Sequence, residues 1–321
     1  MENQLNYLPD KQLAADIVQK SMGESVLAVD RFSTGGCHFV YDVTTESQHS
    51  FVVRIARPSN KEFLVGATYW HRLLKPRGVP LPSILYSDIE AVTSPFPYMI
   101  IERLPGEDLG TVYPQLSRDE KRALAVEMSH IQEIAGTLPP GKGYGFVSSY
   151  ESDSFLKTWT DVLLSSLARS RRRIQAIGAV DSRHVDRVAE KIARHEGYFS
   201  QVKPRCFLDD TTTRNVIVDD GKLSGIVDVD FVCFGDYLFP IALTRMSLLN
   251  TGFDLDYIDF WCEAAHVTEE QREVLQFYTA LFCVDFMGEL GQTFNQESAQ
   301  AVKAEEIERL SSILDMLLNQ I

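Results

Sequence analysis

The segment LDDTTTRNVIVDDGKLSGIVD, residues 208–228, contains two short apolar runs that are joined by a tight turn. The runs cover residues 216–218 and 223–227, and the Asp-Asp-Gly sequence between them favours the turn of a β-hairpin. In such a hairpin Asn215, just before the first strand, and Asp228, just after the second, lie at the same end. The sequence therefore predicts a hairpin whose open end gathers polar side chains.

A third oxygen-bearing side chain, that of Asp210, lies five residues before Asn215. Carboxylate and amide oxygens are ligands of Mg²⁺, which usually shares its coordination shell with the phosphates of a substrate. The spacing Asp-x-x-x-x-Asn, followed by a hairpin and a further Asp, matches the template of kinases, in which the first Asp is catalytic and the other two residues bind metal. We therefore expect Asp210 to be catalytic, and Asn215 and Asp228 to bind Mg²⁺.

These motifs resemble the HGDxxxxN and following I-D elements of the aminoglycoside phosphotransferase and choline kinase-like family. The corresponding residues here are Leu208, Asp209, Asp210 and Asn215, followed by Val227 and Asp228. Leu208 replaces the family's usual His, and Asp209 replaces its usual Gly. The resemblance implies an α+β protein with a two-lobed protein kinase-like fold, with a small β-rich N-terminal lobe and a larger, mainly helical C-terminal lobe. It also implies an ATP-dependent phosphotransferase that phosphorylates a hydroxyl of a small molecule.

Three short β-type runs predict the N-terminal lobe, at residues 26–32, 39–43 and 51–55. Gly35 and Gly36 stand between the first two runs, where backbone N–H groups without side chains can lie over phosphates. A plain hairpin turn is the more common alternative for such a pair. Arg54 replaces the lysine of the kinase template and can hold phosphate oxygens bidentately. We expect these three residues to bind the nucleotide, and a surface Arg on an edge strand is the alternative for Arg54.

The kinase template also requires a carboxylate on the next helix to orient the cation. Glu62 is the obvious candidate, but the resemblance places the family's Glu at about the position of Ala67. A Glu in the first turn of a helix is favoured by the helix dipole alone. The pairing of Glu62 with Arg54 is therefore left open.

An apolar strand that runs into a Pro-Gly turn, YMIIERLPG, resembles the hinge between the lobes of this family. Adenine needs one acceptor and one donor on an extended backbone, and the resemblance places these at the carbonyl of Glu102 and the N–H of Leu104. A buried strand that ends in a turn is the simpler alternative. With a hinge at about 101–106, the expected lobes are residues 1–104 and 105–321.

The rest of the chain is dominated by helical spacing. Capping boxes at residues 117–120 and 268–271 predict the starts of two helices. The basic run RSRRR at residues 169–173 is interpreted as a solvated helix face, because the chain as a whole is acidic.

Asp285 follows Val274 by about three helical turns and so falls on the same apolar face, and Glu289 lies about one turn further along. A carboxylate on such a face must be paired, hydrated or next to a cavity. We expect Asp285 and Glu289 to hold ammonium groups of an acceptor, and a helix end frayed into solvent is the alternative. Asp230, close to Asp228, is either an accessory metal ligand or a substrate contact.

The composition is that of an ordinary globular protein, with 321 residues of which 45% are hydrophobic and 24% charged. The net charge of −14 disfavours nucleic acid and anionic membranes as partners, because both are bound through basic surfaces. It suits a cationic small-molecule substrate, although solubility alone is the more common reason for such a charge. The chain lacks a run of membrane-spanning length and a signal-peptide pattern, so we expect a cytoplasmic location. The five scattered cysteines indicate free thiols.

The departures at Leu208 and Asp209 allow a second hypothesis, a nucleotide-binding pseudokinase that acts as an interaction module. The matching residues Asp210, Asn215 and Asp228 favour the enzyme. The acceptor itself stays open, because aminoglycosides, macrolides, choline-like amines and sugars are all phosphorylated by relatives of this fold.

Overall fold

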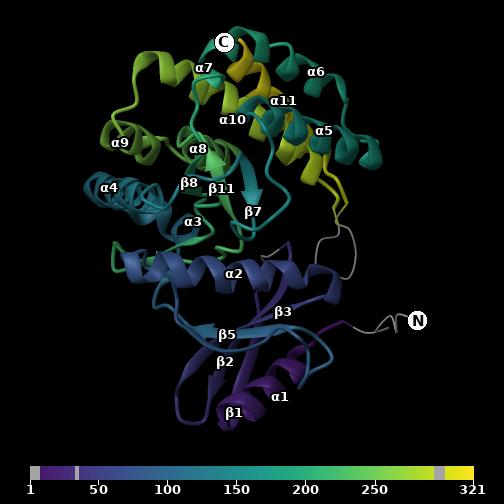
Figure 1. The fold of residues 1–321 in the computed structure, drawn as a ribbon, viewed down its shortest axis with the longest axis vertical. Coiled ribbons are helices and arrows are strands. Elements are labelled where there is room, and N and C mark those ends of the chain that lie inside the picture. The colour runs from purple at the N-terminus through teal and green to yellow at the C-terminus, as the bar shows by residue number, and fades with distance from the viewer. Residues whose placement is uncertain (1–7, 33–35, 293–300) are drawn as a thin grey trace.

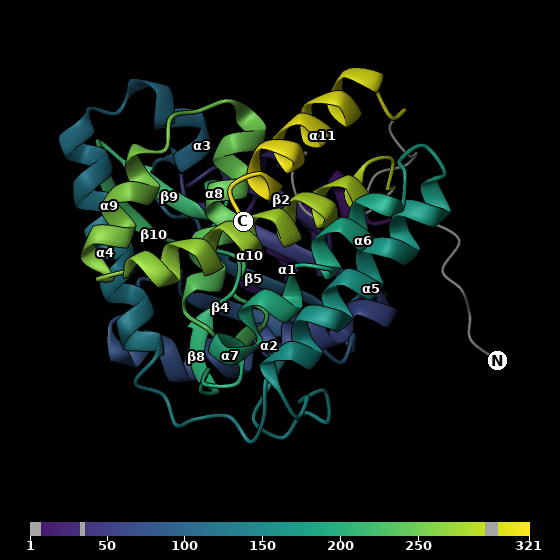
Figure 2. The same cartoon turned by 90° about the horizontal axis from the view of Figure 1, so that it is seen from above.

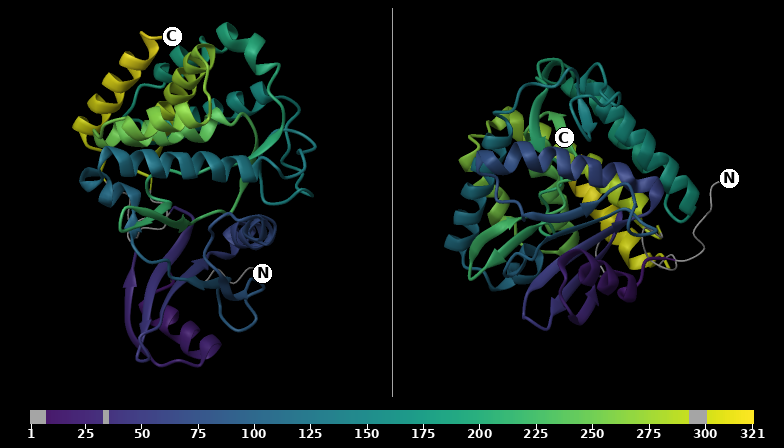
Figure 3. Two further views of the ribbon diagram at one scale, coloured as in Figure 1. Left: turned by 90° about the vertical axis from the view of Figure 1, so that its left-hand side faces the viewer. Right: turned by 60° about the horizontal axis from the view of Figure 1, so that its bottom comes forward.

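The structure is a computed structural model that describes residues 8–32, 36–292 and 301–321. An antiparallel sheet with helix α1 (Lys11–Met22) forms the far end of the N-terminal lobe, and most helices form the C-terminal lobe (Figure 1). Helix α2 (Lys61–Leu74) crosses the molecule between the sheet and the C-terminal helices, as two further views also show (Figure 3). The predicted fold, with a small β-rich lobe and a larger helical lobe, is confirmed.

The N-terminal sheet has five strands in the order β1-β2-β3-β5-β4, and neighbouring strands are antiparallel. Its strands are β1 (Val26–Arg31), β2 (His38–Thr45), β3 (Ser50–Ala56), β4 (Ile84–Asp88) and β5 (Tyr98–Glu102). The three predicted N-terminal strands are therefore confirmed, with small differences at their ends.

Side chains along β3 alternate between the two faces of the sheet, as the pleat of a strand requires. Val53 and Ile55 pack in the cluster that includes residues of α1. Ala56 packs on the other face, in the cluster that includes Leu64 and Ala67 of α2. Arg54, two residues before Ala56, shares this second face, so the alternation turns its side chain toward α2 and the C-terminal lobe.

The C-terminal lobe is built around helix α10 (Glu269–Glu289), which packs against α5, α8 and α11 (Figure 2). Its other helices are α3 (Leu109–Val112), α4 (Arg118–Ala135), α5 (Trp159–Ile177), α6 (Arg183–Ala189), α7 (Glu196–Phe199), α8 (Leu238–Thr251), α9 (Asp256–Ala264) and α11 (Ala304–Leu318). Short 3-10 helices cover Pro58–Asn60, Lys75–Arg77, Tyr113–Gln115 and Ile192–His195. The predicted capping boxes are confirmed at the starts of α4 and α10, where Ser117 and Thr268 cap the helices.

Two small sheets of three strands each carry the loops of the C-terminal lobe. One has the order β10-β9-β6 and the other β7-β11-β8. Their strands are β6 (Glu107–Asp108), β7 (Gly145–Val147), β8 (Arg205–Leu208), β9 (Val216–Asp219), β10 (Lys222–Ile226) and β11 (Val232–Gly235). The predicted hairpin is thus confirmed as β9–β10, and its turn places Asp220 and Gly221 at φ values of 47° and 72°. Two successive positive φ values match the twist of the flanking strands, which explains why Asp-Gly occurs here.

The chain passes from the N-terminal sheet to the C-terminal lobe between β5 and β6. Strand β5 ends at Glu102, and β6 begins at Glu107 and pairs with β9. The division of the lobes at residue 104 stays a prediction.

The structure also bears on membrane-spanning helices and on the cysteines. No helix within residues 8–32, 36–292 and 301–321 is long and apolar enough to cross a membrane. The five cysteines are free thiols, as expected, and all but the half-buried Cys37 are buried.

Candidate active site

The β9–β10 hairpin brings Asp210, Asn215 and Asp228 together at its open end. The amide of Val227 donates a hydrogen bond to the carbonyl of Asn215 over 2.9 Å, which extends the ladder beyond the assigned strands. The side-chain Nδ2 of Asn215 donates to the backbone carbonyl of Asp210 over 3.1 Å. This bond ties the two residues to each other and uses the amide nitrogen of Asn215, not its oxygen.

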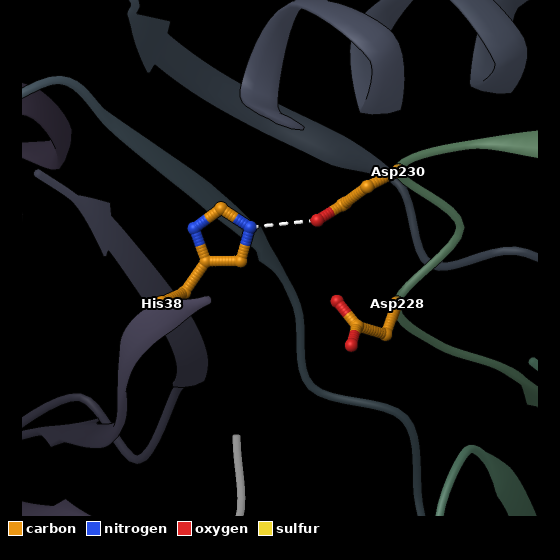
Figure 4. A group of neighbouring side chains, drawn as sticks. All are labelled: His38, Asp228 and Asp230. Carbon is orange, nitrogen blue, oxygen red and sulfur yellow. Dashed lines mark hydrogen bonds and ion pairs between the residues drawn. The ribbon is translucent and has the colours of Figure 1, made fainter. Parts of the chain in front are cut away.

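Asp228 has a left-handed backbone conformation with φ of 64°. This conformation is uncommon for a residue with a Cβ, although Asp adopts it more readily than most, and strained residues of this kind cluster at functional sites. The carboxylate is 47% exposed and lies within 4.8 Å of ligand atoms of His38 and Asp230 (Figure 4). The surrounding protein atoms raise the pKa of Asp228, and the neighbouring Asp230 raises it further while Arg54 opposes the change.

Arg54 reaches from β3 to the loop that follows the hairpin. Its Nη2 donates to Asp228 Oδ1 over 2.5 Å and to the carboxylate of Asp230 over 2.8 Å. Nε2 of His38 lies 2.7 Å from Oδ2 of the same Asp230 (Figure 4). Glu62 takes no part in this group, because its Oε1 accepts a hydrogen bond from Oγ of Ser148 over 2.9 Å. The open question about Glu62 is thereby answered: Arg54 pairs with Asp228 and Asp230 instead.

Leu208, at the family's His position, is held through its backbone. The side-chain amide of Gln132 on α4 accepts a hydrogen bond from the N–H of Leu208 over 2.9 Å and donates one to its carbonyl over 3.0 Å. Gln132 also donates to Oγ1 of Thr211 over 3.3 Å. The polar group that the loop loses at Leu208 is therefore replaced by one from a helix that is distant in sequence.

We expect the variant Gln132→Leu to lose about 1–3 kcal/mol of unfolding free energy, because it leaves the buried N–H and carbonyl of Leu208 without partners. Loosening of residues 209–215 between β8 and β9, here called the catalytic loop because it carries Asp210, should also lower kcat, by up to about 10²-fold. Urea unfolding and steady-state kinetics measure the two effects. Gln276→Leu is the control, because Gln276 is 7% exposed, much like Gln132 at 8%, but lies in α10 and bonds to Arg245 and Gln320. An equal loss of kcat in both variants would refute the special role of Gln132.

An apolar cavity lies beside Arg54 and Asp228, between the N-terminal sheet and the hairpin. Its apolar lining comes from α2, β4, β5 and β10 and the segment before β4, namely Ala67, Leu81, Pro82, Ile84, Met99, Ile101 and Ile226. Apolar walls with charge at one end are typical of a pocket for a ring that carries phosphates, but this cavity has a volume of only about 30 Å³ and would have to widen to admit a base.

The remaining residues predicted to bind nucleotide lie around the same lobe. Gly36 is exposed in the bend before β2, whereas Gly35 lies outside the described residues. Glu102 closes β5, where its N–H donates to the carbonyl of Ser83 over 2.8 Å. Leu104 is buried, and its side chain lies against Gly225 of β10. The adenine contacts assigned to the backbone of Glu102 and Leu104 stay a prediction.

A group of carboxylates lies on the other side of the catalytic loop. Asp209 is half-buried, and its pKa is raised to about 7 by burial and by the neighbouring charge of Asp210, with a further contribution from Asp285. Burial and the charge of Asp285 also raise the pKa of Glu289 to about 7. The carboxylates at the end of α10 are thus close enough to the catalytic loop to influence its charges.

Two arginines of α5 partly neutralise this acidic group. Arg169 donates to Asp285 over 2.9 Å, and Arg173 lies 3.6 Å from Asp285 and 3.7 Å from Glu289. The side chains of Arg169 and Arg173 are 39% and 32% exposed, so the predicted solvated face holds in part, but both also pair with carboxylates of α10. The sequence does not predict that these arginines pair with Asp285 and Glu289, because the run has the pattern of an amphipathic helix surface.

Asp285 and Glu289 differ in how open they are. Asp285 is 8% exposed and also accepts a hydrogen bond from Oγ of Ser170 over 2.9 Å, so it is the paired carboxylate that its position on an apolar face requires. The side chain of Glu289 is 44% exposed. A contact of either residue with an acceptor stays a prediction, and Glu289 is the more accessible of the two.

His38 and Gln132 were not predicted from the sequence as parts of the site. A weak signal exists for His38, because it follows the Gly-Gly turn directly and begins a strand. None exists for Gln132, which is one polar residue among many in a long helix.

A model of the phosphotransferase enzyme family matches residues 31–278. Among proteins with curated functions, none matches this sequence.

Several solved structures have a similar fold. One is the apo form of a thermostable mutant of the aminoglycoside phosphotransferase APH(4)-Ia, which is 15% identical in sequence. The alignment covers 95% of this chain and 98% of that one, with a TM-score of 0.66. The ternary complex of streptomycin, ATP and APH(2'')-IIa is 16% identical, with a coverage of 98% and 99% and a TM-score of 0.66. A GDP complex of an aminoglycoside 2'-phosphotransferase-IIIa mutant is 14% identical, with a coverage of 97% of each chain and a TM-score of 0.68. At such low identities these likenesses show a shared fold.

The likeness to solved structures shows the fold, whereas the match to the family model, which spans most of the chain, shows the family. The chain therefore belongs to the phosphotransferase enzyme family, the aminoglycoside phosphotransferase and choline kinase-like group of small-molecule kinases that its motifs resemble.

Proposed function

We propose that this protein transfers the terminal phosphoryl group of ATP to a hydroxyl of a small cationic molecule. The observation that carries the proposal is the meeting of Asp210, Asn215 and Asp228 with Arg54 beside an apolar cavity between the lobes. A cation for phosphates and oxygen ligands for a metal, next to a space between the lobes, are parts that phosphoryl transfer requires.

Each predicted residue has a distinct part in this proposal. Asp210 orients the acceptor hydroxyl and accepts its proton as the phosphoryl group is transferred. Arg54 holds phosphate oxygens, since a guanidinium binds them bidentately. The remaining nucleotide contacts are backbone groups, at Gly35, Gly36, Glu102 and Leu104.

Mg²⁺ fits the donor set of Asn215 and Asp228, because both offer hard oxygen ligands and the amide of Asn215 is oriented by its bond to Asp210. When bound, the ion neutralises phosphate charge. Complexes of APH(4)-Ia mutants with ADP and with AMP-PNP, each together with hygromycin B, support the nucleotide and the small-molecule acceptor.

The acidic group beside the catalytic loop supports a cationic acceptor. Asp209, Asp210, Asp285 and Glu289 present four carboxylates, and Arg169 and Arg173 supply two opposing charges. When all are ionised, two negative charges remain for a ligand to balance. Because Asp285 already has partners, we assign the acceptor contact first to Glu289 and Asp209.

This assignment predicts that a cationic acceptor binds more tightly as the pH rises. Burial raises the pKa of Asp209 to about 7, so its carboxyl is mostly neutral at lower pH and ionised at higher pH, whereas the side chain of Glu289 is 44% exposed and should contribute less. A cation binds the ionised form better, and affinity should rise by about tenfold between about pH 6 and pH 8 through Asp209. Calorimetric titration at each pH measures this slope.

The double variant Asp209→Asn/Glu289→Gln should bind the acceptor weakly and with a flat pH profile up to the pKa of the ligand's own amine. Glu90→Gln is the matched control, because Glu90 pairs with Lys61 in the N-terminal lobe. An unchanged slope in the double variant would show that other groups hold the acceptor.

Phosphoryl transfer itself is tested with purified protein, MgATP and a panel of aminoglycosides, choline-like amines, macrolides and neutral sugars. Mass spectrometry identifies a phosphorylated product. We expect products from cationic members of the panel, and phosphorylation of neutral or anionic acceptors alone would contradict the proposed acceptor class. Thermal stabilisation by nucleotide without a product across the panel would favour the interaction module instead.

A further inference from the structure

The helix that follows β3 carries no carboxylate opposite Arg54. Arg54 and Ala67 line the same cavity, so the face of α2 that is turned to the guanidinium presents a methyl group there. Glu62, one turn and a half earlier, points to Ser148 instead. In the kinase template a carboxylate of this helix orients the cation, and this chain needs another group for that task.

Asp230 is the buried carboxylate that meets Arg54. The side chains of Arg54 and Asp230 are each 7% exposed, and they are 2.8 Å apart. Asp228 also contacts Arg54, but its side chain is 47% exposed and it is assigned to the metal. A charge-assisted bond between two buried groups fixes geometry more firmly than one that is shared with solvent.

The N-terminal lobe holds Asp230 in place. His38 of β2, which is 4% exposed, contacts Oδ2 of Asp230 over 2.7 Å. Helix α2 approaches so closely at Gly66 that a Cβ there would lie 2.1 Å from the carbonyl oxygen of Asp230. The ring of Phe63 packs edge-on against both His38 and Phe231. The position of this carboxylate is therefore determined by several independent contacts.

We propose that Asp230, held by His38, is the residue that positions Arg54 for the nucleotide phosphates, in place of a carboxylate on the helix. The inference rests on the proposed function, because it takes Arg54 as a phosphate ligand. Asp230 acts through Arg54 and is a positioning residue.

In this arrangement the position of the Arg54 guanidinium depends on the contact between the two lobes. Arg54 and His38 belong to the N-terminal sheet, whereas Asp230 follows the hairpin of the C-terminal lobe. A partner on the helix would stay with Arg54 whenever the lobes separate, but Asp230 would not. Arg54 is thus correctly placed only while the segment from Asp228 to Asp230 is docked on the N-terminal lobe.

The test is titration of a fluorescent ATP analogue into wild-type protein and variants, with Mg²⁺ and again with EDTA. Asp230→Asn should weaken binding by about tenfold to a hundredfold, the effect of losing one charge-assisted bond. The loss should appear in EDTA as well, because a guanidinium contacts phosphate without the metal. A loss that appears with Mg²⁺ alone would overturn the proposal and make Asp230 a metal ligand.

Rescue distinguishes positioning from simple stabilisation. The double variant Asp230→Asn/Ala67→Glu returns a carboxylate to Arg54 from the helix, and we expect it to recover most of the lost affinity. Asp88→Asn is the control for a buried carboxylate, since Asp88 is 8% exposed, lies in the same lobe as Arg54 and bonds to Val92 and Thr93. It should change thermal stability and leave nucleotide affinity unaltered.

A second pair of variants applies if Glu at position 67 prevents folding. His38→Gln keeps a donor for Asp230, and His38→Leu does not, so nucleotide affinity should fall in the Leu variant and be largely retained in the Gln variant. Equal affinity of Asp230→Asn and wild-type protein, with loss of binding in Arg54→Met, would refute the role of Asp230 and leave the proposed function intact. Absence of nucleotide binding by wild-type protein would instead refute the proposed function, and this inference with it.

Discussion

Replacing Asp210 by Ala is expected to lower kcat by roughly 10²- to 10⁴-fold, the range for loss of a general base, while ATP affinity should stay near that of wild-type protein. The carboxylate is exposed at the start of the loop between β8 and the hairpin, where it can reach an acceptor hydroxyl. The substitution retains the backbone carbonyl that orients Asn215. Nucleotide binding should therefore persist, and the loss should fall on the chemical step.

The neighbouring carboxylate provides the control. Asp209→Ala should raise the KM of a cationic acceptor and lower kcat far less, because Asp209 is half-buried toward Asp285 and Arg169. Steady-state kinetics of both variants, with a nucleotide titration beside them, measure the difference. A large loss of kcat in Asp209→Ala together with wild-type turnover in Asp210→Ala would move the catalytic role by one residue.

The parts of the site that depend on local sequence were predictable. The turn at Asp220 and Gly221 specifies a hairpin, and a hairpin brings its two ends together whatever surrounds it. The placement of Asn215 beside Asp228 follows from that geometry alone. The strand that carries Arg54 was equally clear, since FVVRI is a short run of residues that favour β-structure.

The parts that depend on contacts across the chain were not predictable. Gln132 and Leu208 are 76 residues apart, and His38 and Asp230 are 192 apart. A polar residue in a helix or strand gives no sign in the sequence of which distant backbone or carboxylate it will meet. The template even directed attention to Glu62, because a helix after the third strand is where kinases carry this carboxylate.

The position of a charged site in the fold is likewise not predictable from the net charge. A value of −14 allows a cationic ligand but does not locate it. The structure shows that Arg169 and Arg173 neutralise part of the acidic group near the catalytic loop. What the acceptor meets is therefore the local balance around Asp209 and Glu289, which the composition does not contain.

The second large effect is expected at Asp228, where Asn is the informative substitution. Asp228 has a φ of 64°, a region that Asn enters more readily than most residues with a side chain. Asp228→Asn should therefore keep the fold and the thermal stability of the protein. Alanine would add backbone strain at this φ, so a loss of stability could not be separated from the loss of the carboxylate charge.

The charge that Asn removes is the one that faces the metal. We expect Asp228→Asn to lower kcat by about 10²- to 10³-fold, as for the loss of one group that stabilises transition-state charge, and to raise the Mg²⁺ concentration needed for half-maximal activity. Arg54 should stay in place, because Asp230 still binds it at 2.8 Å. ATP affinity in EDTA should then be close to wild type, in contrast to that of Asp230→Asn.

A Mg²⁺ titration of activity, combined with nucleotide titrations in EDTA, separates the two carboxylates. Wild-type turnover and an unchanged Mg²⁺ requirement in Asp228→Asn would remove Asp228 from the metal site. Equal losses in EDTA for Asp228→Asn and Asp230→Asn would show that the two carboxylates act together on Arg54, since both contact the same Nη2. The division of labour proposed here, with Asp228 on the metal and Asp230 on the guanidinium, requires the two variants to differ in EDTA.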